Sequence, residues 1–344
     1  MSRPLPRVLL LMLPAALLAA AFIAAILWGS IALPFNLTMR ALIHPGLSLQ
    51  DLDPDLRRVY AIVWHIRLPR AVAAVSAGMA LSVSGAAIQG LFRNPLASPD
   101  ILGISAGSSL GAVVAIVFGA AAMHPLAISG AAFAGAVGAA LVVYTISARP
   151  GGTHLLYLVL AGLAVSSLLS GLVSGILMIA EEYALSQFIF WTMGGLDGAS
   201  WQRVLPPLPF ILGLTAMMAA LGQALNLLSF GEEHAHSLGL PVEPIKICIL
   251  ISASTLTALA VVVAGPIAFV GLMVPHGVRL LTGPNHRTLL PLSAFAGAIF
   301  LLLTDLLART VVAPREIRTG IITAIVGGPY FIYLILRHRR AGLL

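Results

Sequence analysis

The sequence predicts an all-α, polytopic membrane protein with about ten transmembrane helices, because each span needs roughly 20 apolar residues. Of its 344 residues, 59% are hydrophobic and only 9% are charged, and the mean hydropathy is +1.02. Soluble domains carry about 25% charged residues. The apolar runs are long and uniform, whereas an outer-membrane barrel alternates in segments of about 10 residues. We therefore expect one transmembrane domain over residues 1–344.

The apolar runs place the spans in order along the chain. The first run follows Arg3 and Arg7; it is too long for a signal-peptide core and lacks a small-residue cleavage site, so it is a retained span. An even number of spans puts both termini on one side, and Arg337, Arg339 and Arg340 favour the cytoplasm. The predicted spans are 8–33, 67–92, 99–119, 124–147, 154–180, 201–229, 241–264, 266–282, 287–310 and 318–337.

A polar run, residues 93–107, joins the second and third predicted spans. Ser98 is a predicted N-cap, and Asp100 complements the positive end of the helix that follows. Lipid tolerates such backbone only where protein or a water-filled path covers it. We expect Asn94 and Leu96 to lie where a constriction forms at the cytoplasmic end of the protein.

The fifth predicted span carries polar side chains on one face. The turn Thr153-His154 precedes it on the cytoplasmic side, and Ser166, Ser170 and Ser174 follow at one residue per turn. Such a stripe is typical of a wet, path-lining face. The alternative is that these serines hydrogen-bond to the preceding turn of their own helix.

The largest predicted cytoplasmic loop is residues 230–240. It indicates a short amphipathic helix with Ala235 and Leu238 on one face and Gly239 at its C-terminal cap. A single helix with so little cytosolic mass around it suits docking into the groove of a partner. The alternative is a solvated turn.

On the opposite side, arginines mark the ends of two spans. Arg67 and Arg70 begin the second span three residues apart, and Arg309 ends the ninth. Asp305 lies one helical turn before Arg309 and is expected to form an ion pair with it. These arginines indicate either a charged outer face or internal ion pairing.

Enzyme chemistry is absent from the sequence. The only lysine is Lys246, so no phosphate-binding GxxxxGK[ST] loop exists and the chain is not an ATPase. No metal-binding motif or catalytic triad stands out. Asp305 is the clear intramembrane acid, and ion-coupled carriers usually need more. The energy for transport is therefore expected to come from elsewhere.

Several motifs together resemble one family. The chain is similar to the FecCD-type permease subunits of type II ABC importers, which take up iron–siderophore complexes, haem and cobalamin. The resemblance covers nearly the whole chain from Arg67 onward. Its marks are RLPR at 67–70, RNPLASPDILG at 93–103, GEEHAHSLG at 231–239, GPIAFVGLMVPHGVR at 265–279, HRTLLPLSA at 286–294 and DLLAR at 305–309.

The resemblance implies an assembly in a bacterial cytoplasmic membrane. It implies a second permease subunit, either a copy of this chain or a paralogue, and two cytosolic ATPase subunits that bind ATP and Mg. It also implies a periplasmic or lipid-anchored substrate-binding protein. This chain itself would hold no cofactor or metal and bind no nucleic acid.

The resemblance also assigns roles to residues. Arg67, Arg70 and Arg309 would receive acidic residues of the binding protein, and the turns at 94–96 and 153–154 would form the inner gate. The fifth span would line the path. Coupling to the ATPase would use residues of the loop: Gly231, Glu232, Glu233, Ala235, Leu238 and Gly239.

The favoured hypothesis is a permease that moves an iron chelate, such as a siderophore, ferric citrate or haem, into the cytoplasm. A cobalamin permease of the same family is the alternative. Two rivals come from other classes: an ion-coupled carrier that uses Asp305, and a membrane scaffold that transports nothing.

Overall fold

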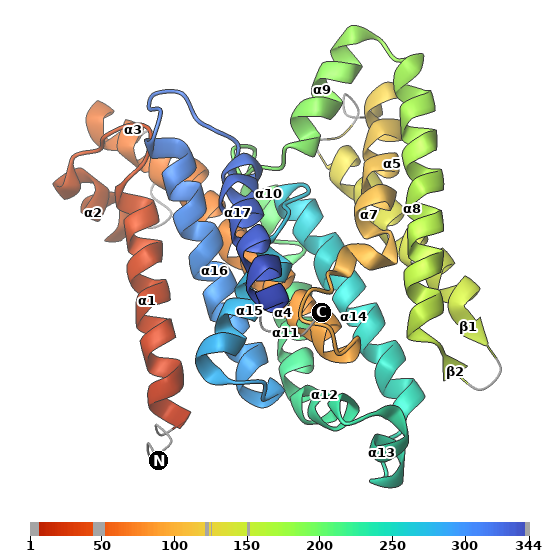
Figure 1. The fold of residues 1–344 in the computed structure, drawn as a ribbon. Helices are drawn as coiled ribbons and strands as arrows, with labels where there is room; N and C mark the ends of the chain where they lie inside the picture. The colour runs from red at the N-terminus through yellow and green to blue at the C-terminus, as the bar shows by residue number, and fades with distance from the viewer. Residues whose placement is uncertain (1–6, 44–51, 121–123, 125, 150–151, 341–344) are drawn as a thin grey trace.

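The computed structural model describes residues 7–340, apart from 44–51, 121–123, 125 and 150–151. Within those ranges the fold is the predicted all-α bundle (Figure 1). Its one β element there is a pair of two-residue antiparallel strands, β1 (Ala148–Arg149) and β2 (Gly152–Thr153).

The helices follow the predicted order of apolar runs. In chain order they are α1 (Arg7–Leu27), α2 (Phe35–Ile43), α3 (Pro54–Ala61), the π-helical η2 (Ile62–Arg67), α4 (Leu68–Leu91), the 3₁₀-helical η3 (Pro99–Leu102), α5 (Ile104–Val117), α7 (Ala127–Ser147), α8 (Leu155–Met178), α9 (Glu182–Thr192), α10 (Trp201–Val204), α11 (Leu208–Ala220), α12 (Gly222–Ser229), α13 (Glu232–Ser237), α14 (Val242–Ala264), α15 (Val270–Thr282), α16 (His286–Thr310) and α17 (Thr319–Arg340).

Several of these helices are long and apolar enough to cross a membrane. Six candidate spans meet both criteria in the described residues, and three shorter apolar helices add to them. The candidates are Pro54–Leu91, Ala127–Ser147, Leu155–Met178, Trp201–Ala220, Val242–Ala264 and His286–Thr310, and the shorter helices are Leu11–Leu27, Ile104–Val117 and Thr319–Leu334.

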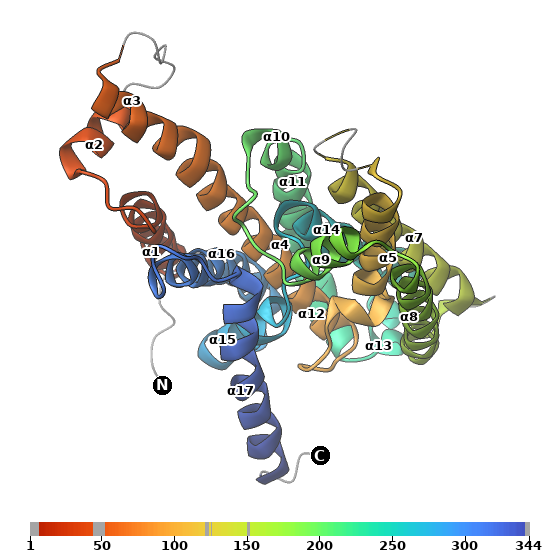
Figure 2. The same ribbon diagram turned by 90° about the horizontal axis from the view of Figure 1, so that it is seen from above.

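Helix α4 forms the centre of the bundle. It packs against α15 and α16 on one side and α14 on the other, and α5, α7 and α8 form a second group beyond α14 (Figure 2). Helices α3 and α9 lie at one end of the molecule, whereas α12, α13 and the β1–β2 pair lie at the other (Figure 1).

Glycines allow the central helices to touch through their backbones. A Cβ atom added at Gly78 of α4 would lie 2.2 Å from the carbonyl oxygen of Gly297 in α16. One added at Gly107 of α5 would lie 2.2 Å from the oxygen of Gly135 in α7. Small residues at such positions let apolar helices pack closely where lipid supplies no hydrophobic drive.

Three expectations need correction. The second predicted span, 67–92, begins too late, because the helix that contains it starts at Pro54 and runs for 38 residues to Leu91. The third span begins with the 3₁₀ turn η3, and its α-helix starts only at Ile104, after Gly103 at φ 74°. The span at 201–229 is broken into α10, α11 and α12.

Candidate transport machinery

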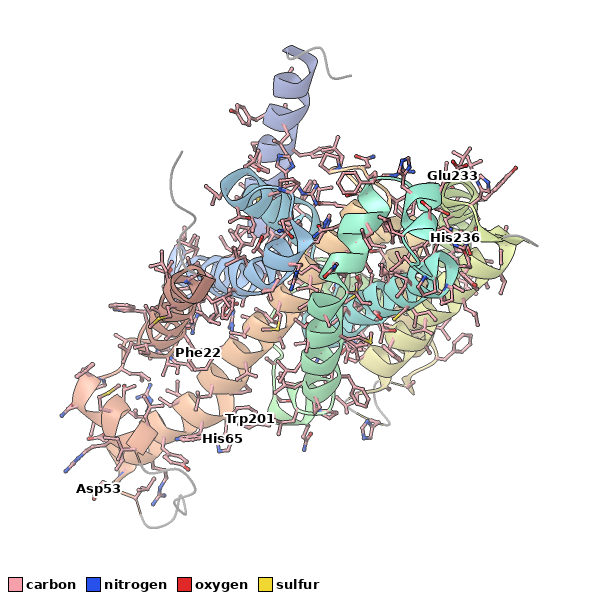
Figure 3. The ribbon with its side chains drawn as sticks, turned by 90° about the horizontal axis from the view of Figure 1, so that it is seen from below. Phe22, Asp53, His65, Trp201, Glu233 and His236 are labelled. Atoms are coloured by element: carbon pink, nitrogen blue, oxygen red, sulfur yellow. The ribbon has the colours of Figure 1, made fainter. Side chains whose placement is uncertain are left out.

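The predicted loop helix exists as α13, between two glycines with positive φ. Gly231 has φ 114° and precedes the helix; Gly239 has φ 84° and ends it. The N–H of Leu240 donates to the carbonyl of Ala235, and that of Gly239 donates to His236, which is a Schellman-type end. Glu233 and His236 project from α13 at the edge of the molecule (Figure 3).

The expected common face of Ala235 and Leu238 is wrong. Ala235 is fully buried against the bundle, whereas Leu238 is 68% exposed. Leu238 is the residue after the last helical position, so it points away from the face that anchors α13. The helix therefore presents one apolar side chain to its surroundings, together with exposed polar residues.

A buried cluster around Lys246 joins α13 to the rest of the protein. The Lys246 ammonium group donates to the carbonyl oxygen of Thr153 at 2.8 Å and to Glu232 Oε2 at 2.9 Å. Glu243 Oε2 lies 3.0 Å from the same nitrogen. Sequence reasoning used Lys246 only to exclude a nucleotide-binding loop and missed Glu243. The available signal was a lone lysine within an apolar span, where ionisable groups are functional candidates by default.

The Thr153-His154 turn before α8, one of the two turns predicted to form the inner gate, lies beside α13. A hollow at this end is lined by Thr153 and His154, by Glu232 and Glu233, and by Arg93 from the polar run. Thr153 is buried, and both its N–H and its hydroxyl donate to Glu243 Oε1. The gate role of the Thr153-His154 turn stays a prediction. The contacts with Glu243 attach the turn to α14.

Asn94 and Leu96 do not line that hollow. The side-chain oxygen of Asn94 instead accepts the N–H of Leu96 at 2.9 Å, which closes a local turn. Asn94 is exposed and Leu96 half-buried. The structure therefore gives these two residues a turn-forming contact, and their part in a gate stays a prediction.

The polar run that begins with Arg93 borders a small, partly open cavity of about 170 Å³. Ser98 caps η3, as predicted, by accepting from the N–H of Asp100. The carboxylate of Asp100 accepts from the hydroxyls of Ser98 and Ser105. These three residues line the cavity with Thr257 of α14, so this part of the run borders a polar space beside α14.

The three serines of α8 lie on a helix that is largely exposed in the isolated chain. Ser166 is half-buried, and Ser170 and Ser174 are exposed. Ser174 donates to the carbonyl of Ser170 at 3.0 Å. This is the bond to the preceding helical turn that was the alternative to a path-lining role. Their path-lining role stays a prediction.

Two of the predicted outer arginines cap helix α1. Arg67 Nη1 donates to the carbonyls of Ile26 at 2.6 Å and Leu27 at 2.8 Å, and its Nη2 donates to Ile31. Arg309 Nη2 donates to the carbonyl of Ala25. The last carbonyls of a helix lack partners within it and carry negative partial charge, which cations satisfy.

The third arginine, Arg70, is held by two acids. Its Nε and Nη2 donate to Asp305 at 3.0 and 2.9 Å, and its Nη1 donates to Glu316 Oε2 at 2.6 Å. The predicted pair of Asp305 with Arg309 is present but longer, at 3.5 Å from Nε to Oδ2. The cluster therefore ties α4, α16 and the segment after α16 together.

The docking prediction expects the three guanidinium groups to face a partner, and the structure does not place them so. Arg67, Arg70 and Arg309 are 3%, 5% and 4% exposed. Glu316 is the more accessible member, with a side chain 29% exposed. Partial burial opposes ionisation of this carboxylate, but the hydrogen bonds from Arg70 and Ser30 and the charges of Arg70 and Arg309 together outweigh burial and lower the pKa of Glu316. Sequence reasoning missed Glu316.

The described residues contain no group of three or more His, Cys, Asp or Glu side chains that could hold a metal ion. Two features define the machinery: an apolar helical bundle, and a short exposed helix tied to an internal turn at one end. Because the sequence has no nucleotide-binding loop, they indicate the class of multi-pass transport subunits that carry no ATPase motif.

The chain belongs to the FecCD transport family, which it matches over residues 17–337. It is 44% identical to the cobalamin import system permease protein BtuC of Halobacterium salinarum, over 83% of this chain and 76% of the relative. It is 43% identical to the hemin transport system permease protein HmuU of Yersinia pestis, over 80% and 85%. An uncharacterized ABC transporter permease, YvrB of Bacillus subtilis, is 39% identical over 94% and 92%.

A solved ABC transporter of the metal-chelate type, in an inward-facing conformation, has the same fold. The similarity covers 95% of this chain and 98% of that one, with a TM-score of 0.80 and 32% sequence identity. This protein is therefore an ABC importer permease, and the fold implied by the resemblance is confirmed.

Proposed function

We propose that this protein is the permease subunit that moves an iron chelate into the cytoplasm, powered by separate ATPase subunits. The observation that carries the proposal is α13, because it is exposed, apolar at Leu238 and bounded by two positive-φ glycines. A short helix of this kind suits the groove of a partner, as amphipathic helices bind generally. In the proposed assembly the partners bind the ATP and Mg.

The proposed assembly has two permease subunits and a substrate-binding protein outside the membrane. The exposed face of α8 would be covered by the second subunit, with Ser166, Ser170 and Ser174 along the path between them. The termini and α13 would lie in the cytoplasm. The binding protein would dock at the opposite end, where Glu316 is the accessible member of the arginine cluster.

The choice of cargo rests on the relatives and the motif at residues 98–100. The Ser98-Pro99-Asp100 form of the turn resembles that of iron-chelate permeases more than that of cobalamin permeases, and one relative is named for hemin transport. Cobalamin is the second candidate, because another relative of similar identity is named for cobalamin import. Binding protein loaded with haem, a ferric siderophore, ferric citrate or cobalamin should stimulate ATP hydrolysis for one cargo class only. A response to cobalamin alone would decide for the alternative.

The structure argues against the ion-coupled rival. Asp305 is 2% exposed and is bonded by Arg70, with Arg309 nearby. Both of its oxygens accept hydrogen bonds from Arg70, so a passing ion could reach this carboxylate only by breaking those bonds.

Docking of the ATPase subunits on α13 is tested by placing a charge at Leu238, the exposed residue at the end of this helix. Leu238→Asp should abolish co-purification of the ATPase subunits, because an aspartate cannot enter an apolar groove without losing its hydration. The permease itself should keep its elution volume, since Leu238 is 68% exposed and its replacement removes little packing. Undiminished co-purification with Leu238→Asp would contradict the proposed role of α13.

A further inference from the structure

Lys246 is the point at which three separate segments meet. Its three ammonium protons have three partners: the carbonyl of Thr153, the carboxylate of Glu232 and the carboxylate of Glu243. Lysine has three donors and no acceptor, so the group is fully used. The side chain is 2% exposed, while the partners lie on β2, α13 and α14.

The turn at Thr153 is held through both the N–H and the carbonyl group of this residue. Glu243 accepts the N–H of Thr153 at 2.8 Å and its hydroxyl, while Lys246 binds its carbonyl oxygen. Gly152 has φ 126°, and a Cβ atom there would lie 3.0 Å from Glu243 Oε2. Glu243 and Lys246 of α14 therefore bind this turn closely, immediately before α8 begins.

Helix α13 has few other attachments. Ala235 is its one buried residue, Glu233, His234, His236 and Ser237 are exposed, and Gly231 and Gly239 bound the helix with positive φ. The Glu232–Lys246 ion pair is its charged link to the bundle. A displacement of α13 would therefore reach the Thr153 turn through the lysine.

Resting on the proposed function, we propose that Lys246 is a positioning residue that couples α13 to the Thr153–His154 turn at the start of α8. Two contacts of one ammonium group join the helix that faces the ATPase to the turn that precedes the path-lining helix. A buried lysine is costly unless paired, and an apolar side chain would fill the site more cheaply. Its presence here fits a role in holding α13 and the Thr153 turn in register.

The sharpest variant cuts one contact and leaves the others. Glu232→Gln replaces the α13 carboxylate that pairs with Lys246 by a neutral amide, while Lys246 keeps Glu243 and Thr153; the Glu232 side chain is 42% exposed, so the fold should tolerate the change. Lys246→Met removes all three contacts, and Lys246→Arg restores a charge. Glu182→Gln is the matched control, because Glu182 is exposed on α9 at the other end of the molecule (Figure 1).

The measurement is cargo imported per ATP hydrolysed by the full complex in proteoliposomes. If Lys246 were merely structural, its loss would lower cargo import and ATP hydrolysis together, in proportion to the amount of folded complex, and their ratio would stay constant. The proposal predicts that Glu232→Gln and Lys246→Met lower cargo per ATP by about tenfold, within the 5–150-fold range typical of coupling between sites. Lys246→Arg should recover part of the loss, and Glu182→Gln should match the wild type.

A second measurement reports the position of α13 relative to the start of α8 directly. Spin labels at Leu156→Cys and His236→Cys, in a Cys248→Ser background, report the distance between the start of α8 and α13; both positions are exposed. We expect a narrow distance distribution in the otherwise wild-type complex and a broad one with Glu232→Gln.

The outcomes separate the two proposals. An unchanged cargo-to-ATP ratio and an unchanged distance distribution in Glu232→Gln would overturn the role of Lys246 alone. Failure of the wild-type complex to import any cargo with ATP would overturn the proposed function, and the coupling role with it.

Discussion

Replacing Asp305 with asparagine should destabilise the protein strongly. The carboxylate is 2% exposed and accepts from Arg70 Nε at 3.0 Å, from Arg70 Nη2 at 2.9 Å and from Thr319 Oγ1 at 3.0 Å. Asparagine keeps the shape and removes the charge, which leaves Arg70 and Arg309 buried with Glu316 as the remaining acid of the cluster. Removing one partner of a buried ion pair costs about 3–5 kcal/mol.

The chain supplies a matched control. Asp197 binds Arg318 at 3.0 Å, nearly the same distance as Asp305 from Arg70, but those side chains are 44% and 31% exposed. Asp197→Asn should cost only about 0–1 kcal/mol, because water screens the pair. The assay is the free energy of unfolding in mixed detergent, followed by the fluorescence of the four tryptophans.

One result would refute this reasoning. If Asp305→Asn loses no more stability than Asp197→Asn, the arginine cluster is not a structural element. A variant of normal stability that instead bound the substrate-binding protein with a changed salt dependence would restore the docking role of Arg67, Arg70 and Arg309.

Three further predictions test the packing of α4 against α16, the turn at Asn94 and Leu96, and the ion pair of Glu316. Gly78→Leu should abolish folded protein on size-exclusion chromatography, because even a Cβ would lie 2.2 Å from the Gly297 oxygen; a normal elution profile would show that α4 and α16 can separate. Asn94→Ala with Leu96→Ala should uncouple ATP hydrolysis or leak cargo; normal transport would leave the pair as turn formers. The lowered pKa of Glu316 means that its ion pair stabilises the fold above about pH 4.5, the ordinary value, and that this stability is lost as pH falls through the lower folded-state value. The melting-temperature difference between wild type and Glu316→Gln should therefore be constant from pH 7 to 5 and shrink at lower pH; a difference that grows on acidification would contradict the assigned pairing.

Hydropathy predicted most of the fold, because lipid permits only backbone that satisfies its own hydrogen bonds. Each uniform apolar run could be given a helix without knowledge of its neighbours. The boundaries that failed are those set by local chemistry. Gly103 in the left-handed region separates η3 from α5, and the helix from Pro54 extends the second run with residues too polar for the apolar pattern to include.

The sites could be predicted only where their residues are close in sequence. The two glycines around α13 and the cap at Ser98 are local signals, and the structure contains both. The hydrogen bond from Lys246 to the Thr153 carbonyl joins residues 93 positions apart, so no spacing rule could pair these two residues. The same holds for Arg67, which caps a helix some 40 positions earlier. Helical spacing placed the arginines on one face without showing that the face is buried.

The central claim is that this chain imports its cargo at the expense of ATP hydrolysed by partner subunits. The direct measurement is uptake of labelled cargo by proteoliposomes that hold the permease and ATPase subunits, with loaded binding protein outside and ATP inside. We expect uptake that requires all components and stops when the ATPase is made catalytically inactive. Uptake that persists without ATP and follows a proton or sodium gradient would contradict it.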